Sequence, residues 1–139
     1  MRDYANTVEL PLLLEQKYGL TEFVRKVVFN ETIRCTLCYT MRLEQTAQVA
    51  RQENFSAFSS SLLYSRYQKH DLLRDIGEEI SKKVGVAFIY RDFREGWQYG
   101  IDQAVVAELY RQPYCGCIYS EQERYDKSLA PPSRQERSL

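Results

Sequence analysis

The sequence predicts an α/β protein in which helices flank a parallel sheet on both faces. Short apolar runs alternate with longer amphipathic stretches, and this alternation is typical of parallel sheets. The clearest strand is the partly β-branched run 86–90, and the clearest helix is 35–54. A length of 139 residues suits one domain. We therefore expect a single domain over residues 1–127 and a disordered tail over 128–139, which has two prolines and no apolar period.

The first thirty residues predict a helix, a strand and a second helix. Residues 1–8 have apolar side chains at helical spacing but no capping residue before them, so the chain is expected to start inside a helix. The apolar run from Leu10 to Leu14 predicts a short buried strand. Thr21 is expected to cap a short helix that carries Val24 and Val27.

The middle of the chain predicts the principal helices and strands. In the stretch 35–54 an apolar stripe recurs at helical spacing, formed by Tyr39, Leu43, Ala47 and Ala50. A strand is expected over 55–63, ending in the serine run 59–61, which could either bind a substrate phosphate or simply close the strand.

The second half repeats this pattern. Asp71 is expected to cap a helix that Gly85 ends, with a core face of Leu72, Leu73, Ile76, Ile80 and Val84. The strand 86–90 and the charged loop 91–96 lead to a helix whose inward residues are Trp97, Ile101, Ala104, Val105 and Leu109. Ser120 is expected to cap a last helix through Tyr125. Three strands are few for a parallel sheet, which with the uncapped start suggests that a preceding β-α portion is missing.

Composition and charge restrict the function classes. Nineteen basic and nineteen acidic residues cancel, so net charge predicts neither a nucleic-acid nor an acidic partner. Arginine outnumbers lysine and there are 11 tyrosines, a choice that suits phosphate contacts and base stacking but is also an ordinary surface composition. No apolar run reaches the length of a membrane span and no signal peptide is visible, so we expect a cytoplasmic protein without membrane contact.

Four cysteines in two tight pairs carry the strongest chemical signal. Cys35 and Cys38 form a C-x-x-C at the start of a predicted helix, and Cys115 and Cys117 form a C-x-C around Gly116. Thiolates at a helix start are stabilised by free N–H groups, and a glycine lets the second pair bend toward one centre. We expect the two pairs to meet and hold one metal centre.

The type of centre stays open at this level. Four thiolates suit zinc and an iron–sulfur cluster equally, although the spacing differs from that of common zinc ribbons. A thioredoxin-like motif would need a strand directly before Cys35, where the sequence has a polar connector. A non-catalytic zinc module is therefore the main alternative to a redox centre.

Other candidate residues have two interpretations each. His70, the single histidine, could donate protons or bind metal, or could be a capping or surface residue. Asp92 could be a general acid or a ligand, or a loop carboxylate paired with arginine and of lowered pKa. Arg111 and Tyr114 flank the second cysteine pair and could contact a phosphate or base, or support the metal site.

Four sequence blocks together resemble the QueH-type epoxyqueuosine reductases. They are Arg34-Cys35-x-x-Cys38-Tyr39-x-x-Arg42-Leu43-Glu44-x-Thr46-Ala47, Leu62-Leu63-x-Ser65-x-Tyr67-Gln68-x-His70, Asp92-Phe93-Arg94-x-Gly96, and Tyr110-Arg111-Gln112-x-Tyr114-Cys115-Gly116-Cys117-Ile118-x-Ser120-Glu121-x-Glu123-Arg124. The blocks run in order from about residue 18 to 125 and include both cysteine pairs.

The resemblance implies a Rossmann-like fold related to the adenine-nucleotide hydrolase-like group. It implies reduction of epoxyqueuosine to queuosine at the wobble position of tRNA, with an iron–sulfur cluster, expected to be 4Fe-4S, and an additional iron close by. On this resemblance Cys35, Cys38, Cys115 and Cys117 are metal ligands. An electron donor, which the sequence does not identify, is also implied.

Residue type and position extend this hypothesis to the substrate. Asp92 or His70 would supply protons to the epoxide oxygen. Arg42, Arg94 and Arg111 would hold phosphates of the anticodon region, and Tyr39 or Tyr114 would stack on a base.

The chain departs from the family pattern in two ways. The family opens with a strand leading to an adjacent Cys-Cys pair, which this sequence does not contain, and Ser61 stands where threonine is usual. We therefore expect an N-terminally truncated form that lacks the first strand and helix. An inactive fragment of the reductase is the corresponding alternative.

Overall fold

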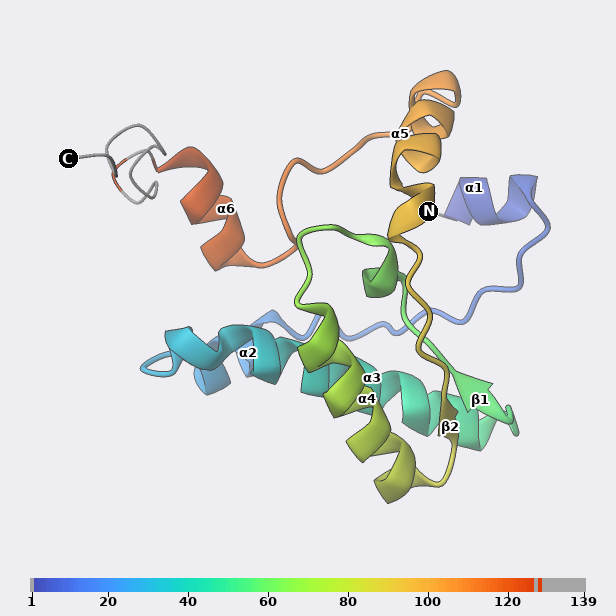
Figure 1. The fold of residues 1–139 in the computed structure, drawn as a ribbon, viewed down its shortest axis with the longest axis vertical. Helices are drawn as coiled ribbons and strands as arrows, with labels where there is room; N and C mark the ends of the chain where they lie inside the picture. Colours follow the sequence, from blue (N-terminus) through green and yellow to red (C-terminus); the bar gives the residue numbers. More distant parts are fainter. Residues whose placement is uncertain (1, 127, 129–139) are drawn as a thin grey trace.

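The protein has a mixed α/β fold that is mostly helical (Figure 1). The structure is a computed structural model that describes residues 2–126 and 128. Its helices are α1 (Arg2–Thr7), α2 (Leu20–Val27), α3 (Arg34–Gln52), α4 (His70–Val84), α5 (Trp97–Val106) and α6 (Ile118–Tyr125). Its strands are β1 (Ala57–Phe58) and β2 (Ala87–Phe88), and its 3-10 turns are η1 (Glu31–Ile33), η2 (Ser61–Tyr64) and η3 (Arg94–Gly96).

The two strands form a small parallel sheet joined through α4. Ala57 pairs with Ala87 and Phe58 with Phe88. The Ile89 amide donates to the Phe58 carbonyl at 2.9 Å, and the Ser59 hydroxyl donates to the Ile89 carbonyl at 2.9 Å. Both strands lie where the sequence predicts them but are shorter, and Ser59 acts here as the end of a strand.

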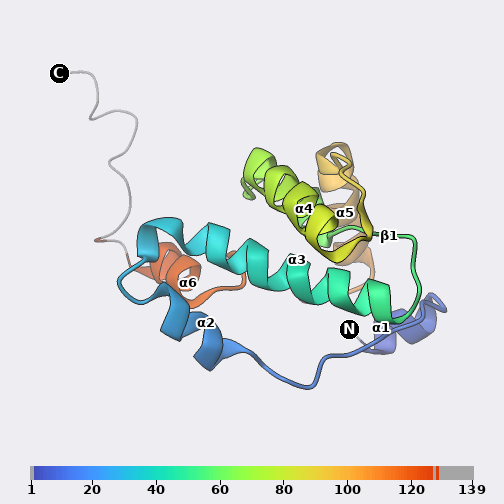
Figure 2. The same cartoon turned by 90° about the horizontal axis from the view of Figure 1, so that it is seen from below.

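The core lies where α3 and α4 pack together and against the sheet (Figure 2). The apolar stripe predicted for α3 is confirmed, because all four of its residues are buried. From α4 the core receives Leu73, Ile76 and Ile80, as predicted, whereas Leu72 and Val84 are only partly buried. The rings of Phe58 and Phe88 lie 5.2 Å apart and close the sheet side of the core.

Two predicted apolar elements are not buried. The run from Leu10 to Leu14 forms no strand, and Leu13 is 65% exposed, so this prediction is wrong. Helix α5 forms as predicted, but Val105 is 64% exposed and none of its residues is buried. Tyr64 packs against the start of α5, where its ring centre lies 5.1 Å from that of Trp97, but this contact does not bury the helix. An apolar pattern alone does not provide a covering partner.

The predicted helix ends are only partly confirmed. Gly85 adopts the left-handed conformation (φ 80°) that ends α4, as predicted. Thr21 and Asp71 lie inside the first turns of α2 and α4, and the N-cap positions belong to Gly19 and Lys69. Ser120 likewise lies inside α6, whose N-cap is Cys117.

The sequence predicts a tail over 128–139, of which residues 129–139 lie outside the described part of the chain. Among the described residues, none of the helices is both long and apolar enough to cross a lipid bilayer.

Gly77 allows α4 to approach β2. A Cβ atom at this position would overlap the ring of Phe88. We expect Gly77→Ala to lower the free energy of unfolding by about 1 kcal/mol, because overpacking costs about 1–3 kcal/mol and the better helix propensity of alanine returns about 1 kcal/mol. Urea unfolding measures this. Gly96→Ala is the control, because a Cβ at Gly96 would meet only Tyr64 at 4.0 Å; equal stability of the two variants would contradict the close packing at Gly77.

Candidate metal centre

The two cysteine pairs lie at the starts of two helices. Cys35 and Cys38 occupy the first turns of α3, and both are partly buried. Cys115 lies exposed in the segment after α5, and Cys117 is the N-cap of α6. All four are free thiols. The first N–H groups of a helix have no intrahelical acceptor, and at α6 the Ser120 amide donates to the sulfur of Cys117.

An ion pair ties the two helix starts together. Arg34, the first residue of α3, donates to Glu123 of α6 at 2.5 Å, and its guanidinium lies 5.8 Å from the ring centre of Tyr119. Figures 1 and 2 both show α6 beside the first turns of α3. Burial disfavours the charged guanidinium, but the hydrogen bond that Arg34 donates to Glu123 and the charge of that carboxylate, with Cys35 and Cys117 nearby, outweigh it and raise the pKa of Arg34.

The second cysteine pair is held by local hydrogen bonds. The Cys117 amide donates to the Cys115 carbonyl at 2.5 Å, which closes a tight turn around Gly116. The Ser120 amide donates to Cys117 Sγ at 3.4 Å, and the Ser120 hydroxyl donates to the Cys117 carbonyl at 2.8 Å. Gly116 does not have a positive φ, and a Cβ there would meet only Gln112 at 3.5 Å. The expected need for glycine at this position is therefore wrong.

Cys38 is the cysteine whose pKa the surrounding residues shift. Burial raises its pKa, Arg42 opposes this through its charge and a hydrogen bond, and Cys115 and Cys117 are near enough to raise it further. Side chains of both pairs thus lie in one region. Within residues 2–126 and 128, however, no three His, Cys, Asp or Glu side chains are placed so that they could hold a metal ion. In this part of the chain the four cysteines therefore do not form a closed coordination site.

Tyr39 belongs to the core and does not face a substrate. Its side chain is 3% exposed, and its hydroxyl donates to Gln68 Oε1 at 2.8 Å and accepts from the Lys69 amide at 3.1 Å. Burial raises its pKa to about 12, despite the opposing bond from Lys69. The prediction that Tyr39 stacks on a base is wrong, because neither ring face is accessible.

Gln68 is a neighbour of the cysteines to which sequence reasoning gave no role. Its Nε2 donates to Cys115 Sγ at 3.3 Å while its Oε1 accepts from Tyr39. The three residues are separated by 29 and 47 positions in sequence, so no local pattern could have indicated the contact.

His70 is held inside the protein. It is 6% exposed at the start of α4, so the prediction of a surface residue is wrong. Its Nε2 lies 3.1 Å from the Ser65 carbonyl and its Nδ1 lies 3.4 Å from the Tyr90 hydroxyl. The carbonyl can only accept, which places the hydrogen on Nε2 and lets Nδ1 accept from Tyr90. A buried ring with a partner at each nitrogen does not fit a residue that delivers protons to a substrate.

Asp92 forms an ion pair within its own loop. Arg94 Nε and one Nη donate to its two carboxylate oxygens at 2.8 and 2.5 Å, and the Arg94 amide adds a bond of 3.0 Å. The side-chain bond from Arg94, followed by the amide bond, holds the pKa of Asp92 well below its usual range. This is the alternative interpretation of a paired loop carboxylate, and a carboxylate ionised at neutral pH cannot act as a general acid.

The Asp92 pairing has a testable pH dependence. A lowered pKa in the folded protein contributes stability above the unfolded pKa near 4, and this contribution is lost as the pH falls through the folded value. We therefore expect the stability difference between wild type and Asp92→Asn to stay constant from pH 7 to about pH 4 and to shrink only below it. Urea unfolding across this range measures it; a difference that changes between pH 7 and pH 5 would contradict the pairing.

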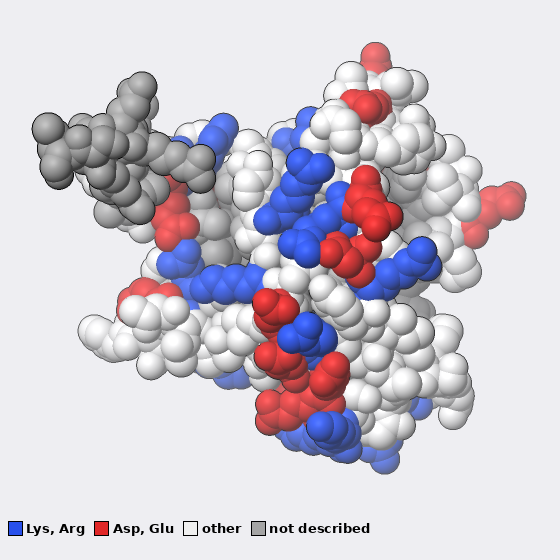
Figure 3. All heavy atoms as spheres, in the orientation of Figure 1, with Lys and Arg blue, Asp and Glu red and all other residues white. Residues whose placement is uncertain are grey.

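The remaining predicted substrate residues lie on two surfaces. Arg42 is exposed beside Cys38, and Arg111 is exposed near the second cysteine pair. Tyr114 is partly buried, with its ring edge-on to Tyr125 at 6.1 Å. Arg94 is engaged with Asp92 in the loop after β2. Figure 3 shows basic and acidic side chains interspersed on one face of the molecule, without a continuous basic surface there.

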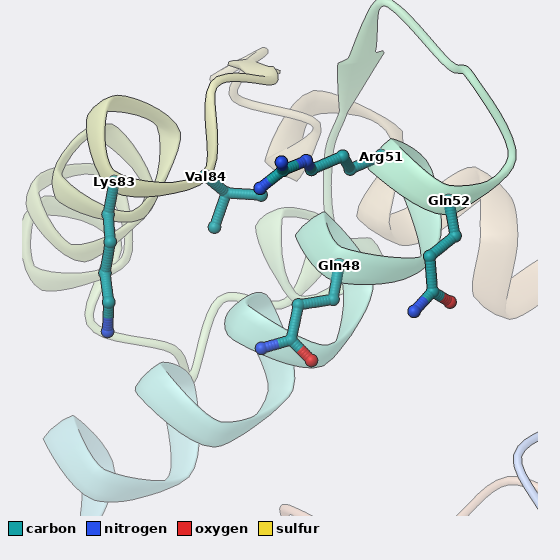
Figure 4. A pocket seen from close by; sticks show the side chains of 5 residues that line it. All are labelled: Gln48, Arg51, Gln52, Lys83 and Val84. Atoms are coloured by element: carbon teal, nitrogen blue, oxygen red, sulfur yellow. The ribbon is translucent and has the colours of Figure 1, made fainter.

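A groove lies at the opposite end of α3. It has a volume of about 450 Å³ and is lined by Gln48, Arg51, Gln52, Lys83 and Val84 (Figure 4). Arg51 extends toward Val84 across the gap between α3 and α4. None of the cysteines lines this groove, so it is separate from the candidate metal centre.

Comparison with known proteins identifies the family. Residues 1–123 match the family model described as epoxyqueuosine reductase QueH. The chain is 38% identical over 131 residues to the epoxyqueuosine reductase QueH of Dehalococcoides mccartyi, covering 94% of this chain and 72% of the relative.

Two further relatives have the same name. The Thermotoga maritima protein is 40% identical over 96 residues, which cover 68% of this chain and 50% of the relative. The Streptococcus pyogenes protein is 32% identical over 122 residues, which cover 83% and 47%. The chain thus spans about half the length of these two relatives. It belongs to the QueH family of epoxyqueuosine reductases, whose named activity is that of an oxidoreductase.

Proposed function

We propose that this chain reduces epoxyqueuosine to queuosine in tRNA and uses an iron–sulfur cluster held by Cys35, Cys38, Cys115 and Cys117. The observation that supports the proposal is the Arg34–Glu123 ion pair, which joins the starts of the two helices near the cysteine pairs in a chain of the QueH family. A 4Fe-4S cluster matches a set of four thiolates, and an additional iron remains part of the proposal on the family resemblance.

The surroundings of the sulfurs suit an anionic cluster. N–H groups of Gln68 and Ser120 point at Cys115 and Cys117. Arg34 and Arg42 supply positive charge beside the two helix starts. Such donors and charges stabilise thiolate ligands and influence the reduction potential of a cluster. Zinc would be held by the same thiolates but has no redox chemistry, so a reductase favours iron.

The reaction removes an oxygen atom from carbon. Converting an epoxide to an alkene takes two electrons and two protons, breaks both C–O bonds and releases the oxygen as water. A bound cluster supplies electrons, which it receives from an external donor, and iron that can act as a Lewis acid. The exposure of Cys115 leaves this side open to solvent, which can provide the protons that neither His70 nor Asp92 is placed to deliver.

The proposed tRNA contacts follow from exposure beside the cysteines. Arg42 and Arg111 would bind phosphates of the anticodon region, and the accessible part of Tyr114 would contact a base. Arg94 would bind a phosphate of the tRNA only while it also keeps its ion pair with Asp92. The family resemblance adds a Rossmann-like arrangement to the proposal. A cytoplasmic location is also part of it, since a tRNA-modifying enzyme acts where its substrate is found.

The proposal is tested with tRNA that carries epoxyqueuosine. Protein purified without oxygen and supplied with iron and sulfide is incubated with this tRNA and a chemical reductant, and the nucleosides are measured by mass spectrometry. We expect loss of epoxyqueuosine and gain of queuosine. Arg111→Ala is expected to weaken tRNA binding, whereas Arg51→Ala, in the groove at the other end of α3, is the matched control. Cluster-loaded protein that forms no queuosine would contradict the proposed activity.

A further inference from the structure

We propose that Gln68 is a positioning residue for Cys115 and that Tyr39 fixes the direction of its side-chain amide. The inference rests on the proposed function, because that function makes Cys115 a metal ligand. Its basis is a chain of three hydrogen bonds, from the Lys69 amide to the Tyr39 hydroxyl, from that hydroxyl to Gln68 Oε1, and from Gln68 Nε2 to Cys115 Sγ.

The direction of the chain follows from its first bond. The Lys69 N–H can only donate, so the Tyr39 oxygen accepts at 3.1 Å and its proton is free for Gln68 at 2.8 Å. The Gln68 oxygen therefore faces Tyr39, and the NH₂ group must face Cys115 at 3.3 Å. An inverted amide would leave the tyrosine proton without an acceptor and turn an oxygen toward the sulfur.

The chain connects a rigid part of the protein to an exposed one. Tyr39 follows Cys38 directly in α3, and its ring is buried in the same cluster as Leu43 and Leu63. Cys115, in contrast, is exposed in the segment between α5 and α6. Gln68 bonds to both, so its hydrogen bonds fix the position of Cys115 relative to α3, the helix that carries the first cysteine pair.

An N–H donor directed at a ligand sulfur has a defined consequence for metal binding. It stabilises the thiolate and restricts its orientation, and loss of such an outer partner typically lowers metal affinity about 10–100-fold. Tyr39 does not reach the sulfur itself in this chain of bonds. Tyr39 must therefore act on Cys115 through Gln68. An effect of Tyr39 on metal binding that disappears without Gln68 distinguishes this positioning role from general stabilisation of the core.

Gln112 provides a matched control in the same segment. Its Nε2 donates to the Tyr114 carbonyl at 2.9 Å instead of to a sulfur. Replacing either glutamine by methionine keeps the side-chain length and removes the amide, but only Gln68→Met removes a donor to Cys115.

The first experiment measures Co²⁺ affinity of the metal-free full chain through the thiolate-to-cobalt absorption band. Gln68→Met is expected to weaken binding about 10-fold or more, Tyr39→Phe to weaken it less, and Gln112→Met to leave it unchanged. The double variant Tyr39→Phe/Gln68→Met should bind no more weakly than Gln68→Met alone. Wild-type affinity in Gln68→Met, or additive losses in the double variant, would overturn the proposal.

The second experiment does not depend on metal binding. In the metal-free protein, the ¹H–¹⁵N resonances of the Gln68 side-chain amide should move in Cys115→Ser and in Tyr39→Phe, and stay in place in Cys117→Ser. Gln68 side-chain amide resonances that do not shift in Cys115→Ser would overturn the positioning role. If wild type binds no Co²⁺ through thiolates while these resonances respond as expected, the metal centre fails and the Gln68 contact stands.

Discussion

Replacing Cys38 with serine is expected to abolish retention of iron and to reduce epoxyqueuosine turnover at least about 100-fold. The expectation exceeds the roughly 10–100-fold cost of losing an outer partner, because a ligand itself is removed. Cys38 is the critical choice because it is partly buried and its pKa responds to Arg42 and to both cysteines of the second pair. Iron content after anaerobic reconstitution and nucleoside mass spectrometry are the measurements.

Thr40→Ser is the control for this variant, since it places a serine in the same helix without removing a thiol. It should retain iron and activity at the wild-type level. If Cys38→Ser retained its iron while remaining folded, the four-cysteine centre would be wrong, and the region between α3 and α6 would be a structural contact held by Arg34 and Glu123.

Replacing Leu43 with alanine is expected to lower the free energy of unfolding by about 2–5 kcal/mol. Leu43 is 1% exposed at the centre of the α3 stripe, where α3 meets α4. Alanine is a strong helix former, so the loss measures packing and cavity formation and not helix propensity. Equilibrium urea unfolding of the metal-free protein gives the value.

Leu13→Ala is the matched substitution outside the core, because Leu13 is 65% exposed. It should change stability by less than about 0.5 kcal/mol. Comparable losses at Leu13 and Leu43 would mean that the run from Leu10 to Leu14 is covered in solution and that the core extends beyond α3, α4 and the sheet.

The parts of the fold that could be predicted are those with a long local signal. The stripe of α3 extends over three turns, and Gly85 marks the end of α4 by a backbone conformation that other residues adopt at a cost. Short apolar runs have neither a repeated spacing nor a residue that marks their end. The run from Leu10 to Leu14 predicts a strand by its composition, but whether it pairs depends on a neighbouring edge that the local sequence does not specify.

The candidate site shows the same division. The cysteines could be identified because residue type and spacing report metal chemistry directly. The roles of Tyr39 and Gln68 could not, because they arise from contacts between residues 29 and 47 positions apart. Asp92 is an intermediate case: the nearby arginines indicated a possible ion pair, but only the side-chain bonds from Arg94 decide in favour of it.

Analysis of iron, acid-labile sulfide and zinc in protein purified without oxygen tests the central claim most directly. The account predicts a brown protein with a broad absorbance at about 400 nm, about four sulfide per chain, and about four iron per chain, or about five with the additional iron. A colourless protein with about one zinc per chain and no sulfide would contradict it and would make Cys35, Cys38, Cys115 and Cys117 a structural zinc site.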